Sequence, residues 1–177
     1  TFGGLFNSGQ ACESVTRILV HEAIHDQLME KLAAVCDTLV VGNPLDPATS
    51  YGPIANKNQY DRIMGYIDGA KQQGLTFVCG GEPIKPKGFE GGYYVQPTII
   101  TDVKNDMDIA QQEIFGPVLS VIKFSDEQQA IEIANETSYG LSAGVWSDDL
   151  VHAQKIAKQL QAGSIWINDW HMLRSDA

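Results

Sequence analysis

The segment Val118–Phe124 decides the fold, because its sequence VLSVIKF is an apolar run of strand length. Ser125 follows it directly, and Gln128 comes three residues later, in a capping-box pattern that predicts a helix to about Asn135. A second strand, a second helix and a third strand follow. Because parallel strands are joined by right-handed crossovers, this order predicts a three-layer α/β unit that ends at Asn168.

The elements after Asn135 follow from the same periodicities. Residues 143–146 form a short apolar run, which predicts a strand. Residues 164–168 are apolar on both faces, as expected of a strand buried within a parallel sheet. Between these strands, a helix ending before Gly163 has an apolar stripe of Ala153, Ile156, Ala157 and Leu160.

Upstream of Val118, helical and extended patterns also alternate. A helix is predicted from about Ala23 to Thr38, with an apolar face of Ile24, Leu28, Leu32 and Val35. A second helix, which Gly74 stops as a C-cap, has an apolar face of Tyr60, Ile63, Ile67 and Ala70.

Extended segments follow the second predicted helix. Thr76–Cys79 has the pattern of a short strand, and residues 85–92 form a surface loop rich in Gly, Pro and Lys. Residues 93–100 are extended but contain Pro97, which places them at a sheet edge. No internal repeat or linker divides the sequence, so we predict one α/β domain over residues 1–177, with three layers and a mostly parallel sheet.

The composition limits the class of protein. The 177 residues suffice for a sizeable core, and the net charge of −10 argues against nucleic acid or an anionic membrane as a partner. No apolar run has the length of a membrane span, and no Cys/His spacing predicts a zinc site. The three cysteines are widely spaced and odd in number, which indicates a reducing compartment such as the cytoplasm.

The segment 6–12, FNSGQAC, places Cys12 just after a Gly-Gln turn. We expect a helix over Cys12–Arg17, whose N-terminus would stabilise the thiolate, the reactive form of cysteine. Backbone N–H groups there could hold an oxyanion. A thiolate and oxyanion donors together are what addition to a carbonyl requires. The alternative is a structural cysteine, since free cysteine commonly packs as a small hydrophobe.

Four blocks in this order resemble the motifs of the NAD(P)-dependent aldehyde dehydrogenases, and the resemblance covers nearly the whole chain. The first has the pattern aromatic-x-x-Gly-Gln-x-Cys followed by Arg, at Phe6, Gly9, Gln10, Cys12 and Arg17. The other three are Gln112–Val118, similar to a cofactor-side Glu-x-Phe-Gly-Pro motif, then Asn135 with residues 139–143, and Gly163–Asn168.

The resemblance implies roles for individual residues. Cys12 would be the nucleophile that adds to an aldehyde, and Glu113 and Phe115 would contact NAD or NADP. Substrate-pocket positions would be Phe6, Ala11, Glu13, His171 and Leu173. Two interpretations of Glu13 stay open: it points to solvent, or it lines the pocket and favours a cationic aldehyde. In either case its charge should raise the Cys12 pKa.

The resemblance also implies parts that this sequence does not contain. The family's dinucleotide-binding domain, its general-base Glu and its oxyanion-hole Asn lie upstream of the cysteine motif, and its oligomerisation strand lies downstream. We therefore expect a fragment that is inactive by itself, from a cytoplasmic homodimer or homotetramer.

Three other functions remain open at this point. A CoA-acylating dehydrogenase would use the same cysteine. A cysteine hydrolase would need a histidine beside Cys12, although His21, His25 and His152 have the pattern of surface residues. The chain could also be a non-catalytic binding or oligomerisation module. Cys36 and Cys79 are predicted to belong to the core.

Overall fold

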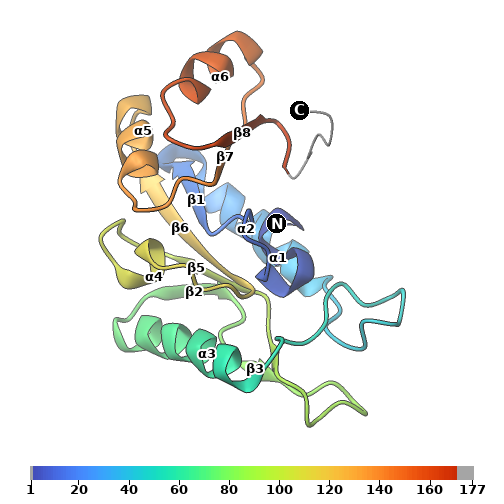
Figure 1. Ribbon diagram of the computed structural model, residues 1–177. Helices are drawn as coiled ribbons and strands as arrows, with labels where there is room; N and C mark the ends of the chain where they lie inside the picture. Colours follow the sequence, from blue (N-terminus) through green and yellow to red (C-terminus); the bar gives the residue numbers. More distant parts are fainter. Residues whose placement is uncertain (1, 171–177) are drawn as a thin grey trace. The chain divides into compact units, whose positions relative to one another are not determined.

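The computed structural model describes residues 2–170 (Figure 1). The chain forms two compact units, Thr1–Phe124 and Ser125–Ala177. The α/β class with a mixed, mostly parallel sheet is as predicted. The single domain over residues 1–177 stays a prediction.

The first unit is built on a four-stranded sheet with the order β1-β6-β5-β2. Its central strand β6 (Val118–Phe124) runs parallel to β1 (Arg17–His21) and to β5 (Thr98–Thr101). The edge strand β2 (Thr76–Cys79) is antiparallel to β5. Both β2 and β6 have the predicted boundaries.

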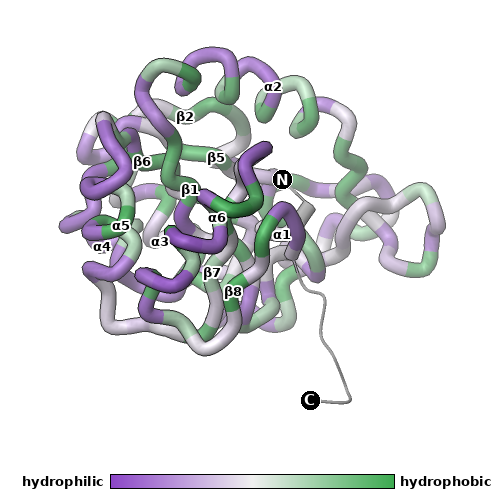
Figure 2. The backbone as a smooth tube through the Cα atoms, turned by 90° about the horizontal axis from the view of Figure 1, so that it is seen from above, coloured by the Kyte–Doolittle hydropathy of each residue, from purple (hydrophilic) through white to green (hydrophobic). Residues whose placement is uncertain are grey.

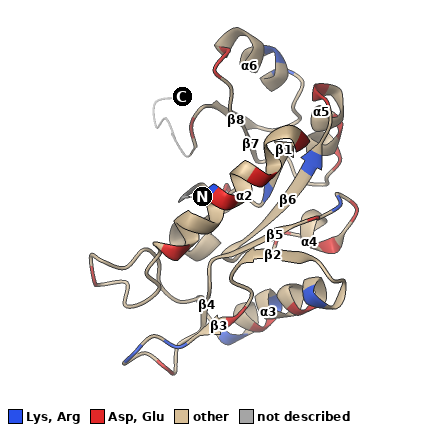
Figure 3. Cartoon of the chain, turned by 180° about the vertical axis from the view of Figure 1, so that it is seen from behind, with Lys and Arg blue, Asp and Glu red and all other residues tan. Residues whose placement is uncertain are grey.

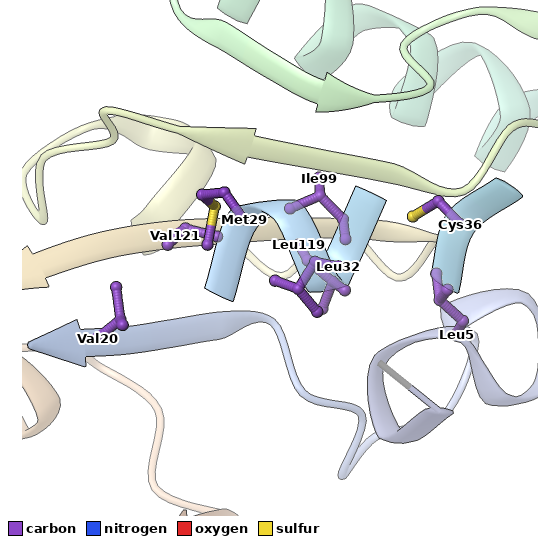
Figure 4. Close-up of a cluster of buried hydrophobic side chains, with 8 residues drawn as sticks. All are labelled: Leu5, Val20, Met29, Leu32, Cys36, Ile99, Leu119 and Val121. Carbon is purple, nitrogen blue, oxygen red and sulfur yellow. The ribbon is translucent and has the colours of Figure 1, made fainter. Parts of the chain in front are cut away.

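Helix α2 (His25–Asp37) packs on the sheet through Met29, Leu32 and Cys36. Figure 4 shows these side chains facing residues of β6 and β5. The helix itself was predicted, but its buried face is rotated from the predicted stripe, since Ile24 is 53% and Val35 40% exposed. The remaining members of this cluster are Leu5, Val20, Ile99, Leu119 and Val121. In Figure 2, α2 accordingly alternates between hydrophilic and hydrophobic residues.

Helix α3 (Lys57–Gln72) lies on the side of the sheet opposite to α2, which gives this unit three layers (Figures 1 and 3). It buries Ile63, Ile67 and Ala70, as predicted from their spacing. Gly74, with φ of +72°, follows the helix end in the left-handed conformation expected of a C-cap glycine.

The prediction that residues 93–100 lie at a sheet edge is wrong for the part after Pro97. Pro97 lies between β4 (Tyr94–Val95), which pairs with β3 (Pro83–Ile84), and β5, which is an inner strand of the main sheet. The proline is tolerated because it falls where the chain passes from one sheet to the other and no ladder needs its N–H.

The second unit contains α5 (Glu127–Asn135), β7 (Ser142–Val145), α6 (Leu150–Ala157) and β8 (Ser164–Ile167). Strands β7 and β8 pair in parallel as a separate two-stranded sheet, so β6 and β8 do not share the single sheet that the sequence predicted. Strand β8 is half-buried rather than buried on both faces.

The capping box of α5 begins one residue later than predicted. The Asp126 side chain accepts a hydrogen bond from the Gln129 N–H, and the Gln129 side chain accepts one from the Ser125 N–H. Aspartate is as good an N-cap as serine, so the local chemistry is unchanged. Within residues 2–170, no helix is both long and apolar enough to cross a bilayer.

Candidate active site

Cys12 lies in a tight turn rather than at the start of a helix. The short helices α1 (Phe2–Leu5) and η1 (Phe6–Gly9) precede it, Ser14 N–H donates to the Ala11 carbonyl, and β1 begins at Arg17. The predicted helix over residues 12–17 is therefore wrong. Valine and threonine at residues 15–16 favour the extended backbone that leads into β1. A helix dipole consequently does not act on the thiol from this segment.

The residues before Cys12 form an unusual backbone turn. Asn7, Ser8 and Gly9 have successive φ values of 49°, 60° and 69°, in the left-handed region that non-glycine residues rarely adopt. Ser8 is 2% exposed, and its hydroxyl donates to the Gly52 carbonyl at 2.9 Å. Tertiary contacts therefore hold this strained turn in place.

Gln10 ties the same loop to the segment that precedes α3. Its side-chain carbonyl accepts a hydrogen bond from the Ala55 N–H at 2.9 Å, and its amide donates to the Pro53 carbonyl at 3.4 Å. A glutamine can make both bonds because its amide carries a donor and an acceptor. This residue of the cysteine motif thus positions the loop.

The first two motif blocks meet at a pair of glycines. A Cβ atom on Gly9 would lie 2.0 Å from the carbonyl oxygen of Gly116, so only glycine fits there. Gly116 is itself packed against Ile63 of α3, whose side chain a Cβ would meet at 2.5 Å. The loop that carries Cys12 therefore lies directly against the turn that contains Glu113 and Phe115.

Helix α3 holds this second turn by two side chains that the sequence did not single out. After α4 (Asp108–Gln111), the carbonyls of Ile114 and Phe115 accept hydrogen bonds from the Gln59 amide at 2.7 and 3.0 Å. Arg62 donates to the Ile114 carbonyl at 3.1 Å. Their partners are backbone atoms more than 50 positions along the chain, so no local pattern could reveal them.

The two predicted cofactor contacts differ in exposure. Glu113 is exposed, and Phe115 is half-buried with φ of +57°. An aromatic residue with positive φ is rare, and the hydrogen bonds from α3 to the neighbouring carbonyls maintain it. Arg17 donates to the Asn105 side chain at 2.7 Å and thereby links the start of β1 to the loop before α4.

The Cys12 thiol is exposed and donates a hydrogen bond to the Glu13 carboxylate, with Sγ and Oε2 3.0 Å apart. This bond, together with partial desolvation and the carboxylate charge, raises the pKa of the Cys12 thiol above its ordinary value. The expected direction of the Glu13 effect is thus confirmed. The expectation that a helix N-terminus favours the thiolate is wrong, because Cys12 lies in a turn.

Of the other residues predicted to line the substrate pocket, the structure describes only some. Phe6 is exposed and Ala11 is half-buried, both on the Cys12 loop. His171 and Leu173 lie outside the described residues. In the second unit, Asn168 joins the ends of β7 and β8, because its side chain both accepts from and donates to the Ser147 backbone at 2.8 Å.

The three described histidines bond to residues other than Cys12. His25 is buried and bonds to Thr101 and Asp26, each at 2.7 Å, so its prediction as a surface residue is wrong. His152 pairs with Glu127 at 2.6 Å, and His21 accepts the Ala23 N–H. None of these three histidines is therefore placed to act as the base of a cysteine hydrolase at Cys12.

The other two cysteines belong to the interior. Cys36 is buried as predicted, and Cys79 is half-buried with its thiol donating to the Pro97 carbonyl at 3.3 Å. Among residues 2–170, no group of His, Cys, Asp and Glu side chains could hold a metal ion.

The whole sequence, residues 1–177, matches the aldehyde dehydrogenase family. Among curated proteins, a betaine aldehyde dehydrogenase of Mesorhizobium japonicum is 44% identical over 170 residues, which are 96% of this chain and 35% of that protein. A chloroplastic betaine aldehyde dehydrogenase of Amaranthus hypochondriacus is 41% identical over 94% of this chain and 33% of its own length. The chain therefore spans about a third of the length of these relatives.

Solved structures agree with the sequence matches. A betaine aldehyde dehydrogenase of Staphylococcus aureus in complex with NAD+ has a TM-score of 0.95 at 38% identity, and covers 99% of this chain and 35% of its own. An aldehyde dehydrogenase of Mycobacterium tuberculosis, also complexed with NAD+, has a TM-score of 0.91 at 41% identity, over 97% of this chain and 35% of its own.

Proposed function

This chain belongs to the aldehyde dehydrogenase family, and from that premise we propose that it carries the nucleophile of an enzyme that oxidises an aldehyde to a carboxylic acid with NAD or NADP. The observation that carries the proposal is the meeting of two loops at Gly9 and Gly116, one bearing an exposed thiol and the other an exposed carboxylate. This contact supports the proposal because the proposed nucleophile and the proposed cofactor contact lie on adjoining loops.

The proposed reaction has two covalent stages at Cys12. The thiolate adds to the aldehyde carbon, forming a C–S bond and a thiohemiacetal whose oxyanion takes hydrogen bonds from backbone N–H groups such as that of Cys12. Loss of hydride from that carbon leaves a thioester. Water then cleaves the C–S bond, which releases the carboxylic acid and restores the thiol.

The residues of the second turn fit a dinucleotide. Exposed Glu113 can accept hydrogen bonds from ribose hydroxyls, and the half-buried ring of Phe115 can pack beside a sugar or a nicotinamide. When bound, NAD(P) supplies the acceptor for the hydride. Gln59 and Arg62 hold the backbone between these two side chains, so the contacts are preorganised.

The test compares Cys12→Ala and Cys79→Ala in a full-length protein that contains this chain, given an aldehyde and NAD+. Loss of a covalent nucleophile lowers turnover by roughly four to six orders of magnitude, so we expect Cys12→Ala to abolish NADH formation, measured by its absorbance. Cys79→Ala should retain it. Mass spectrometry should find the acyl group on Cys12 of the unsubstituted protein.

Two results would refute the proposal: NADH formation at the original rate by Cys12→Ala, or an acyl group on another residue. Release of an acyl-CoA when coenzyme A replaces water would instead indicate the acylating branch of the family. Since its relatives are about three times as long, we also propose that the 177-residue chain alone gives negligible turnover.

We propose a cytoplasmic setting and a homodimeric or homotetrameric assembly for the protein. The setting is supported by the three free thiols, which suit a reducing compartment. The substrate would be a small aldehyde, for which the relatives named above supply the precedent.

A further inference from the structure

The feature with an unassigned role is the carboxylate next to the proposed nucleophile. Glu13 follows Cys12 directly, is half-buried, and has Oε2 3.0 Å from Sγ. Only a protonated thiol can donate this hydrogen bond, because the thiolate has no proton to share. The observed contact therefore selects the thiol form of Cys12.

Charge acts in the same direction as the hydrogen bond. Among residues 2–170, Glu13 is the charged group that shifts the pKa of the Cys12 thiol. A carboxylate at this distance raises that pKa because it opposes a second negative charge. Backbone N–H groups of Cys12 and Glu13 favour the thiolate, but their combined effect is the smaller one. The resting site is consequently biased against its own reactive form.

We propose that Glu13 is a positioning residue that holds Cys12 as a resting thiol, so that less of the reactive thiolate is present near neutral pH than without this carboxylate. The inference rests on the proposed function, because it concerns the thiol that the proposed reaction uses. Cys12 held in this way would react slowly with electrophiles and oxidants, since these react with thiolates.

The experiment follows alkylation of Cys12 by iodoacetamide in the 177-residue chain from about pH 6 to pH 10. In this reaction a C–S bond forms, the C–I bond breaks, iodide leaves and the thiol proton passes to water. Peptide mass spectrometry reports Cys12, Cys36 and Cys79 separately. The variants are Glu13→Gln, which removes the charge, and Glu13→Asp, which keeps the charge on a shorter side chain. Glu30→Gln, at an exposed position of α2, is the matched control.

We expect Glu13→Gln to alkylate at Cys12 about three- to tenfold faster near pH 7, because more thiolate is present although each thiolate is a weaker nucleophile. Its pH profile should have a lower midpoint, and the curves should converge at high pH. The alkylation rate of Glu13→Asp should fall between the rates of Glu13→Gln and the original chain. Glu30→Gln should react at the rate of the original chain. An unchanged midpoint in Glu13→Gln would overturn the inference.

Rapid alkylation of buried Cys36 would reveal that a variant has misfolded. In that case a second measurement, which needs no substitution at Glu13, tests the inference. The Raman S–H stretching band of Cys12, assigned by its loss in Cys12→Ala, should persist to a higher pH than that of free cysteine. Loss of the band at or below the pH of free cysteine would contradict the inference. Neither readout needs dehydrogenase activity, so this test remains valid if the proposed function fails. Likewise, failure of the Glu13 inference would not affect the test of the proposed function.

Discussion

At the scale of single residues, the site depends on backbone positions that few side chains tolerate. Asn7, Ser8 and Gly9 all have positive φ, and Gly9 approaches the Gly116 carbonyl too closely for any Cβ. The glycine of the cysteine motif is thus required by a contact with the other motif. Its importance for the site comes from geometry, since it contributes no chemical group of its own.

Gly9→Ala should destabilise the chain by more than about 2 kcal/mol, because the added methyl meets backbone atoms and the φ of +69° is strained for alanine. Urea unfolding measures this. The matched control is Gly65→Ala in α3, where a Cβ meets nothing within 4 Å. That variant should gain about 0.5–1 kcal/mol, since alanine is the better helix former. Equal effects of the two substitutions would contradict the close contact.

At the scale of elements, α3 acts as a support for the turn with the two predicted cofactor contacts. Its buried face packs against the interior through Ile63 and Ile67, while Gln59 and Arg62 reach the carbonyls of the turn. A helix provides a rigid base, so these hydrogen bonds can maintain the left-handed Phe115.

Gln59→Leu should weaken NAD+ binding by a full-length protein that contains this chain, because it removes both Gln59 hydrogen bonds to the turn. The Phe115 carbonyl then loses this donor, and the Ile114 carbonyl keeps only the one from Arg62. The lost hydrogen bonds should also lower the unfolding free energy by about 1–3 kcal/mol. Calorimetric titration with NAD+ and urea unfolding measure the two effects. The neighbouring exposed Asn58 supplies the control, Asn58→Leu. If Gln59→Leu bound NAD+ as Asn58→Leu does, the supporting role of α3 would be wrong.

At the scale of the whole molecule, ionic contacts tie strand ends together in the first unit. Asp102 follows β5, accepts a hydrogen bond from Thr76 of β2 and pairs with Lys123 of β6 at 3.1 Å. The Thr76 bond first, and Lys123 second, lower the pKa of Asp102 below its ordinary 3.8. A lowered pKa means that ionised Asp102 favours the folded state.

This contribution should be fully present above about pH 4 and be lost as the pH falls through the lowered pKa of Asp102. Asp102→Asn should therefore unfold more easily near pH 7, with a difference that disappears once the pH has fallen below the lowered pKa of Asp102. Asparagine suits the test because it tolerates the φ of +60° at this position. Thermal unfolding as a function of pH measures the effect. The control is Asp68→Asn, at an exposed position of α3. A difference that did not change with pH would point to packing instead of charge.

The sequence by itself determined the elements whose signals are local. The apolar run of β6, the spacing of Ile63, Ile67 and Ala70, and the glycine that stops α3 all predicted what is observed. The motif blocks around Cys12 and Glu113 likewise identified the family, because they consist of consecutive residues that can be compared without coordinates. Errors arose where a local signal was ambiguous, as with the serine and aspartate that both suit the cap of α5.

The tertiary structure alone decided which of these pieces lie together. The contact of Gly9 with Gly116, the support of the second turn by Gln59 and the burial of His25 against Thr101 each join residues that are distant in the chain. The residues after Cys12 form a turn and a strand because β1 pairs with β6, and this long-range pairing adds to the preference of β-branched Val15 and Thr16 for extended backbone. Sequence periodicity reports which face an element buries, but packing selects its neighbours.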